Sequence, residues 1–149
     1  MKKPLVWSLA SGVVWIGVAS AIAYAVAPIR RTPLAAAKTF GGGIVAAPAI
    51  GLLVGYIARR FSDLSRLQRL KMALADLYLA TYLFQLATGV EHVVRGWFTR
   101  GYVESLQRQL VVDPLLGTIF GLTYTGFVVV LLPLSYFNHL LIAKVWNRC

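Results

Sequence analysis

Acidic residues are scarce in this sequence, and cysteine is almost absent. Five aspartates and glutamates stand against fifteen lysines and arginines, and Cys149 is the single cysteine. One cysteine cannot form a disulfide within the chain, so we expect no internal covalent cross-link. With ten net positive charges, the chain is strongly basic.

Charge of either sign is also scarce. Charged residues make up 13% of the 149 residues and hydrophobic ones 58%, against roughly 25% and roughly 45–50% in an average protein. A soluble domain of this composition would expose apolar surface and aggregate. The composition therefore indicates a membrane protein, and the length indicates one domain covering residues 1–149.

The motifs of common enzymes are missing. The sequence has no His-Glu-x-x-His, no phosphate loop, no Gly-x-Ser-x-Gly and no paired cysteines. The glycines at Gly41, Gly42 and Gly43 follow no strand pattern, so they do not indicate a nucleotide site. We predict no metal site and no cofactor, and the sequence leans away from an enzyme.

Four long apolar runs are present instead. They predict membrane spans at about 5–28, 34–58, 73–94 and 115–143, because roughly 20 helical residues cross a hydrocarbon core of roughly 30 Å. The predicted fold is an all-α integral membrane bundle of four transmembrane helices joined by short loops. The first run also resembles a cleavable signal peptide, but its apolar part is longer than the 7–15 residues typical of one, so we expect retention.

The cations lie in short clusters between the apolar runs, which favours lipid headgroups over nucleic acid as their partner. Antiparallel spans divide them into two groups. On the side of the termini are Lys2, Lys3, Arg59, Arg60, Arg66, Arg69, Lys71, Lys144 and Arg148. On the other side are Arg30, Arg31, Lys38, Arg95, Arg100 and Arg108. Because the first group is larger, we expect both termini in the cytoplasm and the protein in the cell (inner) membrane.

Small residues recur at four-residue intervals in two of the runs. Such intervals place them on one helix face, where a neighbouring backbone can approach closely. The predicted packing faces contain Gly43, Ala47, Gly51 and Gly55 in the second run, and Gly117 and Gly121 in the last. Pro48 and Pro133 lie inside these two runs and predict kinks.

The third run carries a stripe of mostly polar residues. At 100° per residue, seven side chains fall in a sector about 120° wide. This polar stripe consists of Tyr78, Thr81, Tyr82, Gln85, Thr88, Gly89 and His92. We expect it to face the interior as a hydrogen-bonded seam. The alternative is a transport pathway or ligand pocket.

Two acids of this run lie off the stripe. We expect Asp76 to be an interfacial charge near the start of the span, and Glu91 to pair with Arg95 at the favourable i, i+4 spacing. The expected partners of Asp76 are Arg66, Arg69 and Lys71. His139 lies near the end of the last run, so antiparallel spans hold it far from His92 and the two cannot share one haem within a subunit. Asp76, Glu91 and His139 are secondary site candidates.

Three functions remain after these exclusions. The leading one is a non-enzymatic accessory or structural subunit that packs through its helices in a homo-oligomer or with other membrane proteins. The second is a small transporter or channel lined by the polar stripe. The third is a membrane-embedded enzyme in which Glu91, His92 and nearby arginines act on a lipid-linked anionic substrate. No interaction with nucleic acid is expected.

Overall fold

The computed structural model is all-helical, and no strand occurs in residues 2–26, 41–101, 105–124 and 126–147, which are those that the structure describes. Of residues 2, 19–26, 41–43, 100 and 124 it describes the backbone alone. The elements in chain order are α1 (Lys2–Val26), the 3₁₀ helix η1 (Gly41–Ala46), α3 (Ala47–Phe61), α4 (Arg66–Arg100), the π helix η2 (Arg108–Val112), α5 (Asp113–Ile119), the π helix η3 (Phe120–Tyr124) and α6 (Phe127–Trp146).

Three of the described helical segments are long and apolar enough to cross a membrane: Ile44–Phe61, Arg66–Thr99 and Phe127–Trp146. This confirms the all-helical part of the prediction, and the three segments are consistent with a membrane protein. The helix α1 has 25 residues, and its apolar stretch with described side chains, Lys3–Val18, is shorter than these three. The expected end of the first span at 28 and start of the second at 34 lie outside the described residues.

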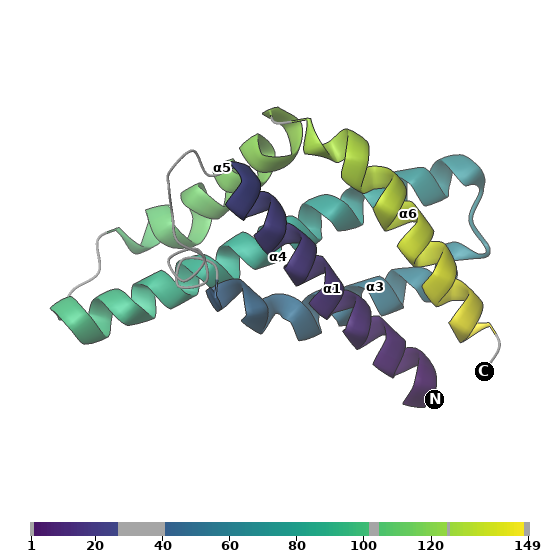
Figure 1. The fold of residues 1–149 in the computed structure, drawn as a ribbon, viewed down its shortest axis with the longest axis horizontal. Coiled ribbons are helices and arrows are strands. Elements are labelled where there is room, and N and C mark those ends of the chain that lie inside the picture. Colours follow the sequence, from purple (N-terminus) through teal and green to yellow (C-terminus); the bar gives the residue numbers. More distant parts are fainter. Residues whose placement is uncertain (1, 27–40, 102–104, 125, 148–149) are drawn as a thin grey trace.

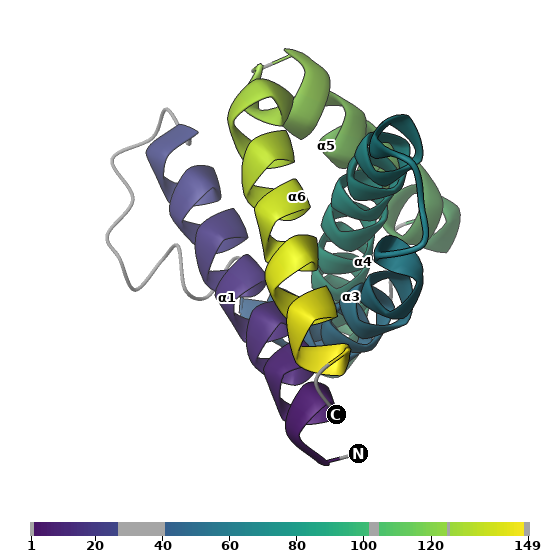
Figure 2. The same cartoon turned by 90° about the vertical axis from the view of Figure 1, so that its right-hand side faces the viewer.

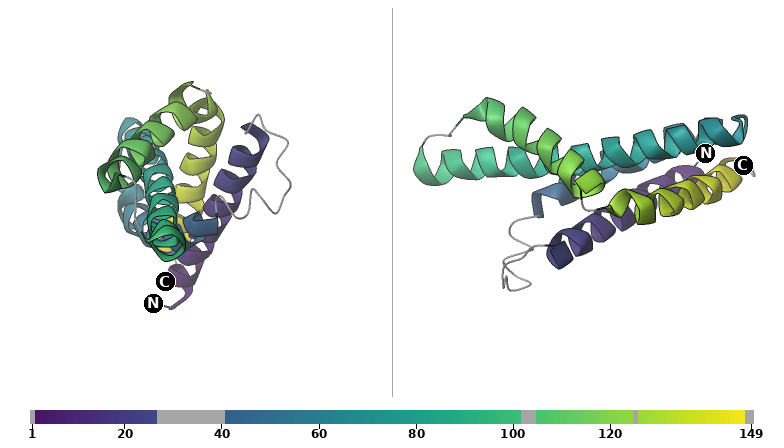
Figure 3. Two further views of the ribbon diagram at one scale, coloured as in Figure 1. Left: turned by 90° about the vertical axis from the view of Figure 1, so that its left-hand side faces the viewer. Right: turned by 90° about the horizontal axis from the view of Figure 1, so that it is seen from above.

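The helices form two layers. The turn at residues 62–65 joins α3 and α4 into an antiparallel pair, and α1 and α6 lie against this pair from one side (Figure 1 and Figure 3, right). The same arrangement seen from the end of the bundle has α6 between α1 and α4 (Figure 2). Of these helices, α3 and α6 each contact all three others.

The start of α1, the α3–α4 turn and the end of α6 meet at one end of the bundle. The Asn147 side chain donates a hydrogen bond of 2.7 Å to Ser62 Oγ in the turn. The Trp146 indole N–H donates to Ser8 Oγ over 3.4 Å, and the Arg59 guanidinium lies over the Trp146 ring. These contacts fix three elements that are far apart in the sequence.

The longest helix, α4, has sequence signals at both ends. Ser65 and Gln68 form a capping box, in which each side chain bonds the backbone N–H of the other residue. At the far end Gly101 adopts φ 71°, a left-handed conformation that stops the helix. With 35 residues, α4 is about 52 Å long, so it exceeds the bilayer core. Along its length it contacts α6 and α3, then η1, α5 and η2.

The contact between α1 and α3 is close enough to require glycine. A Cβ added at Gly12 would lie 2.1 Å from the Ala47 carbonyl oxygen, and one at Gly51 would lie 2.7 Å from the Ser8 carbonyl oxygen. A Cβ added at Gly55 would lie 2.7 Å from Ser8 Oγ. The small residues of the second run therefore face α1, and Ala47, Gly51 and Gly55 are buried there. The remaining member of that set, Gly43, lies in η1.

The sequence suggests one continuous helix over 115–143, but the last apolar run does not form one. Gly126 adopts φ 71° and separates η3 from α6, and this left-handed geometry carries no steric penalty for glycine. This break is hard to recognise from the sequence, because a single glycine marks it and glycine is frequent within membrane helices. As a result α5 packs along α4, and η3 contacts α4 through the Tyr78–Thr123 hydrogen bond. In the described part of this run, α6 is the helix long enough to span.

The two prolines occupy different settings. Pro48 lies at the first or second position of α3, where its missing N–H would have no partner within the helix. It therefore lies at the change from η1 to α3, across which the backbone stays helical. Pro133 lies inside α6.

Gly12→Ala tests the close contact between α1 and α3. The added methyl group overlaps the Ala47 carbonyl, so we expect the free energy of unfolding in detergent to fall by about 1–3 kcal/mol, the usual cost of overpacking. Gly17→Ala is the matched control on the same helix, because no atom lies within 4 Å of its Cβ position. It should be neutral or stabilising by up to about 1 kcal/mol. Equal stability of both variants would contradict the packing described.

Candidate functional site

The polar stripe of α4 faces the segment from η2 to η3. The Tyr78 hydroxyl and Thr123 Oγ1 are hydrogen-bonded at 2.7 Å. The Gln85 side chain lies against Gly117, where an added Cβ would be 3.2 Å from Gln85 Cδ. A Cβ added at Gly89 would lie 2.4 Å from the Gln109 carbonyl oxygen. The stripe is thus covered along most of its length.

The two threonines of the stripe satisfy their hydroxyls within α4. Thr81 donates to the Leu77 carbonyl over 2.8 Å and Thr88 to the Phe84 carbonyl over 3.0 Å. This bonding to the preceding turn lets a hydroxyl lie in an apolar interior without a second helix. Tyr82 is half-buried and His92 is exposed. The stripe is therefore buried at Thr88, half-buried at Tyr78, Thr81, Gln85 and Gly89, and exposed at His92.

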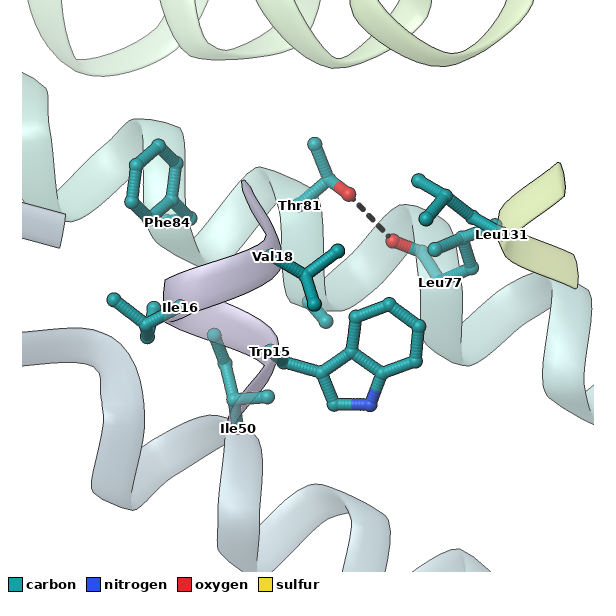
Figure 4. Close-up of a pocket in the computed structure, with 9 residues that line it drawn as sticks. Trp15, Ile16, Val18, Ile50, Leu77, Thr81, Phe84 and Leu131 are labelled. Atoms are coloured by element: carbon teal, nitrogen blue, oxygen red, sulfur yellow. Dashed lines mark hydrogen bonds between the residues drawn. The ribbon is translucent and has the colours of Figure 1, made fainter. Parts of the chain in front are cut away.

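A cavity of about 30 Å³ lies beside the stripe, between α1, α3, α4 and α6 (Figure 4). It is lined by Trp15, Ile16, Val18, Ile50, Leu77, Ala80, Thr81, Phe84 and Leu131. Thr81 is the stripe member among them, and its hydroxyl is turned to the Leu77 carbonyl. A buried water needs two to four polar partners, which this lining does not provide. The cavity is an apolar packing gap.

Asp76 does not pair with the cations near the start of α4, contrary to the expectation. It is 2% exposed, and its Oδ2 lies 3.3 Å from Nε2 of His139, which is fully buried. Arg69 instead donates to the Ser62 and Leu64 carbonyls of the α3–α4 turn. The reason is that α6 crosses α4 on the face that carries Asp76. A helical wheel of α4 places Asp76 off the stripe but does not show which helix covers that face.

The surroundings of His139 hold its ring in place. Nδ1 lies 2.7 Å from the Ser135 carbonyl oxygen, one turn earlier in α6. The Ser135 hydroxyl donates to the Ala73 carbonyl of α4 over 3.2 Å. Phe61 of α3 stacks on the imidazole, with ring centroids 5.2 Å apart. Three helices therefore meet at this acid–histidine pair.

The other candidates lie at the far end of α4. Glu91 and Arg95 form the ion pair that their spacing predicts, and His92 is exposed beside them. His92 follows Asp76 by sixteen residues, which is about 24 Å of helix. His92 and the Asp76–His139 pair therefore belong to different parts of the molecule. Gly121 has no atom within 4 Å of its Cβ position, so it does not form a close contact like that of Gly117.

Sequence reasoning missed the polar contacts that attach α1 to α6. Asn138 donates to Ser11 Oγ over 2.7 Å, and Trp146 donates to Ser8 Oγ. The Ser8 hydroxyl in turn donates to the Pro4 carbonyl. The available signal was that Ser8 and Ser11, three residues apart, are polar side chains within an apolar run.

Within the described part of the chain, no group of three or more histidine, cysteine, aspartate or glutamate residues is placed to hold a metal ion. Comparisons with protein-family models, with curated proteins and with solved structures find no match for this chain. Its function has to be argued from its own geometry.

The Tyr78–Thr123 hydrogen bond gives a direct measure of how strongly the stripe holds the η3 segment. In a double-mutant cycle with Tyr78→Phe and Thr123→Val, we expect a coupling energy of about 0.6 kcal/mol, and at most about 1.7, as for other hydrogen bonds between membrane helices. Tyr82→Phe is the control, because its hydroxyl has no hydrogen bond to any residue that the structure describes. Strict additivity of the two substitutions would contradict the contact.

Proposed function

We propose that this protein is a non-enzymatic accessory subunit of the membrane, which acts by packing its helices in an oligomer or a larger complex. The observation that carries this proposal is the internal bonding of the polar stripe. Tyr78, Thr81 and Thr88 spend their hydrogen bonds on the chain itself. Tyr78 joins α4 to η3, whereas Thr81 and Thr88 bond to the backbone of α4 itself. Hydroxyls occupied in this way favour a packing role over a lined pathway.

The proposed architecture is a four-span bundle in which α1 is a retained span. At 25 residues, α1 is about 37 Å long and sufficient to cross the core. Its buried face, which includes Ser8, Ser11, Gly12 and Ile16, packs on α3 and α6. A helix with small and hydrogen-bonded polar residues at its contact face is typical of a membrane bundle.

The outward faces support lipid or partner helices as the surroundings. On α6 the exposed side chains at helical spacing are large and apolar: Val130, Leu134, Phe137 and Leu141 are each more than half exposed. Polar groups such as Ser135 and His139 are buried on the opposite face. This apolar-out, polar-in arrangement is what a hydrocarbon environment favours.

In the proposed orientation the protein lies in the cell membrane with both termini in the cytoplasm. The end of the bundle where α1 begins and α6 ends also carries Arg59, Arg60, Arg66 and Lys144, all exposed. Cations near the ends of spans are enriched on the cytoplasmic side. The opposite end carries Trp97 and Phe98, exposed beside Arg95, as an interfacial belt.

The subunit proposal is tested by native mass measurement and chemical cross-linking of the protein extracted in a mild detergent. We expect a defined homo-oligomer or a stoichiometric complex with other membrane proteins. Extraction in a harsh detergent that dissociates helices is the control for non-specific cross-linking. A lone monomer without a co-purifying partner would count against the proposal.

The orientation is tested with the single native cysteine. A membrane-impermeant maleimide should label Cys149 in inverted vesicles and leave it unlabelled in intact cells, because the proposed C-terminus is cytoplasmic. A Cys149→Ser variant with a cysteine at Thr99, at the opposite end of α4, should give the reverse pattern. Labelling of Cys149 in intact cells would overturn the orientation.

A further inference from the structure

The imidazole of His139 has one nitrogen already committed. Nδ1 lies 2.7 Å from the Ser135 carbonyl oxygen, and because a carbonyl only accepts, Nδ1 carries a proton in this arrangement. A neutral His139 therefore presents the bare lone pair of Nε2 to Asp76. An ionised Asp76 presents only lone pairs in return. Without a further proton, the two groups are acceptors that face each other.

The two groups also lack other partners. Within the described part of the chain, neither Asp76 Oδ1 nor His139 Nε2 has a hydrogen bond, although Oδ2 and Nε2 are 3.3 Å apart. Both side chains are almost fully removed from solvent. An unpaired charge in such a place is strongly unfavourable. One proton between Oδ2 and Nε2, after a small side-chain rotation, converts the repulsive contact into a hydrogen bond.

We propose that Asp76 and His139 form a binding site for a single proton, and that this proton holds α6 against α4. The ligand is the proton itself, shared as a neutral acid with a neutral imidazole or as a carboxylate with an imidazolium. The inference is independent of the proposed subunit function, because it concerns only the contact of two helices within the chain.

The charged groups on the neighbouring elements are occupied elsewhere or point outward. On α3, the Arg59 guanidinium lies over Trp146 and that of Arg60 over Tyr56. On α4, Arg69 lies 5.9 Å above the Phe61 ring and donates to the turn carbonyls. Among the side chains that the structure describes, the remaining exposed charged groups around this end are Lys3 on α1, Asp63 in the turn, Arg66 and Lys71 on α4, and Lys144 on α6. Phe61 covers His139 on the side of the turn.

A one-proton site has a definite pH signature. In the unfolded chain an aspartate titrates near pH 3.9 and a histidine near 6.5, so between these values the unfolded pair also carries about one proton and stability is level. Above pH of about 6.5 the unfolded pair loses its proton and the folded pair keeps it. Stability then falls as pH rises, by up to about tenfold in the folding equilibrium constant per pH unit. Below about 3.9 the unfolded pair binds two protons, so stability falls with acid.

Asp76→Asn should invert this profile. The asparagine amide donates to Nε2 and so replaces the proton with a bond that cannot titrate. The folded pair then binds no proton, whereas the unfolded histidine gains one below pH of about 6.5. Stability should be level above about 6.5 and fall below it. Asp63→Asn is the matched control: it removes an equal charge from an exposed site in the α3–α4 turn and should keep the wild-type profile.

The experiment is the thermal unfolding midpoint of the full chain in a non-ionic detergent, measured from pH 3 to pH 9 for the three proteins. A decline above pH of about 6.5 in the wild type and the Asp63→Asn variant, absent from Asp76→Asn, supports the site. Identical profiles for the Asp76→Asn and Asp63→Asn variants would overturn it.

A second measurement applies if Asp76→Asn does not fold. The chain has two histidines, so His92→Gln leaves His139 as the one imidazole observed by ¹⁵N NMR. We expect Nε2 to give a hydrogen-bonded signal that does not change between pH 5 and 8. A signal of an unbonded lone-pair nitrogen at neutral pH would exclude a shared proton.

Discussion

A hydroxyl, amide or carboxyl group surrounded by hydrocarbon has no water to bond, so its partner has to come from the protein. In this chain three contacts between distant elements follow that constraint. Tyr78 bonds Thr123, Asn138 bonds Ser11, and Ser135 bonds the Ala73 carbonyl. Each of these bonds joins two elements that are distant in the sequence. The few polar side chains of an apolar chain therefore decide which helices lie side by side.

Glycine supplies the second requirement, which is close approach. Because apolar side chains gain little by leaving lipid for protein, membrane helices associate through tight packing. The Gly12 and Gly51 contacts bring the backbones of α1 and α3 together, and Ser8 fits against Gly55 in the same interface. At the other end of the molecule Gly89 of α4 allows η2 to approach, and Gly117 allows α5 to lie against the Gln85 side chain of α4. Hydrogen bonds determine which helices pair, and the small residues determine how closely their backbones approach.

Local sequence patterns predicted a good part of this structure. The apolar runs correctly indicated an all-helical protein with helices long and apolar enough to cross a membrane, and the Glu91–Arg95 pair follows from helix geometry alone. The helical wheel of α4 placed Asp76 outside the polar stripe. In the structure Asp76 faces α6, whereas the stripe faces the segment from η2 to η3. These features depend on residues within one helix, where a period of 3.6 residues carries the information.

The rest depends on contacts that no single helix reveals. Asp76 and His139 are 63 residues apart in the sequence, and their pairing requires the crossing of α6 over α4. That crossing in turn depends on Gly126, which ends η3 and redirects the chain. Nothing distinguishes this glycine in the sequence from Gly121, which lies within η3. The backbone conformation at one residue thus decides whether the last apolar run forms one helix or two segments.

The claim that the polar stripe is a dry seam within the bundle is tested most directly by cysteine scanning of α4 in a Cys149→Ser background. Single cysteines at Tyr78, Thr81, Gln85 and Thr88 are exposed to a small water-soluble thiol reagent, with a cysteine at exposed His92 as the positive control. We expect modification at His92 and none at the four stripe positions. Modification at those four positions, with the intervening Leu79 and Leu83 unreactive, would show a water-filled pathway and contradict it.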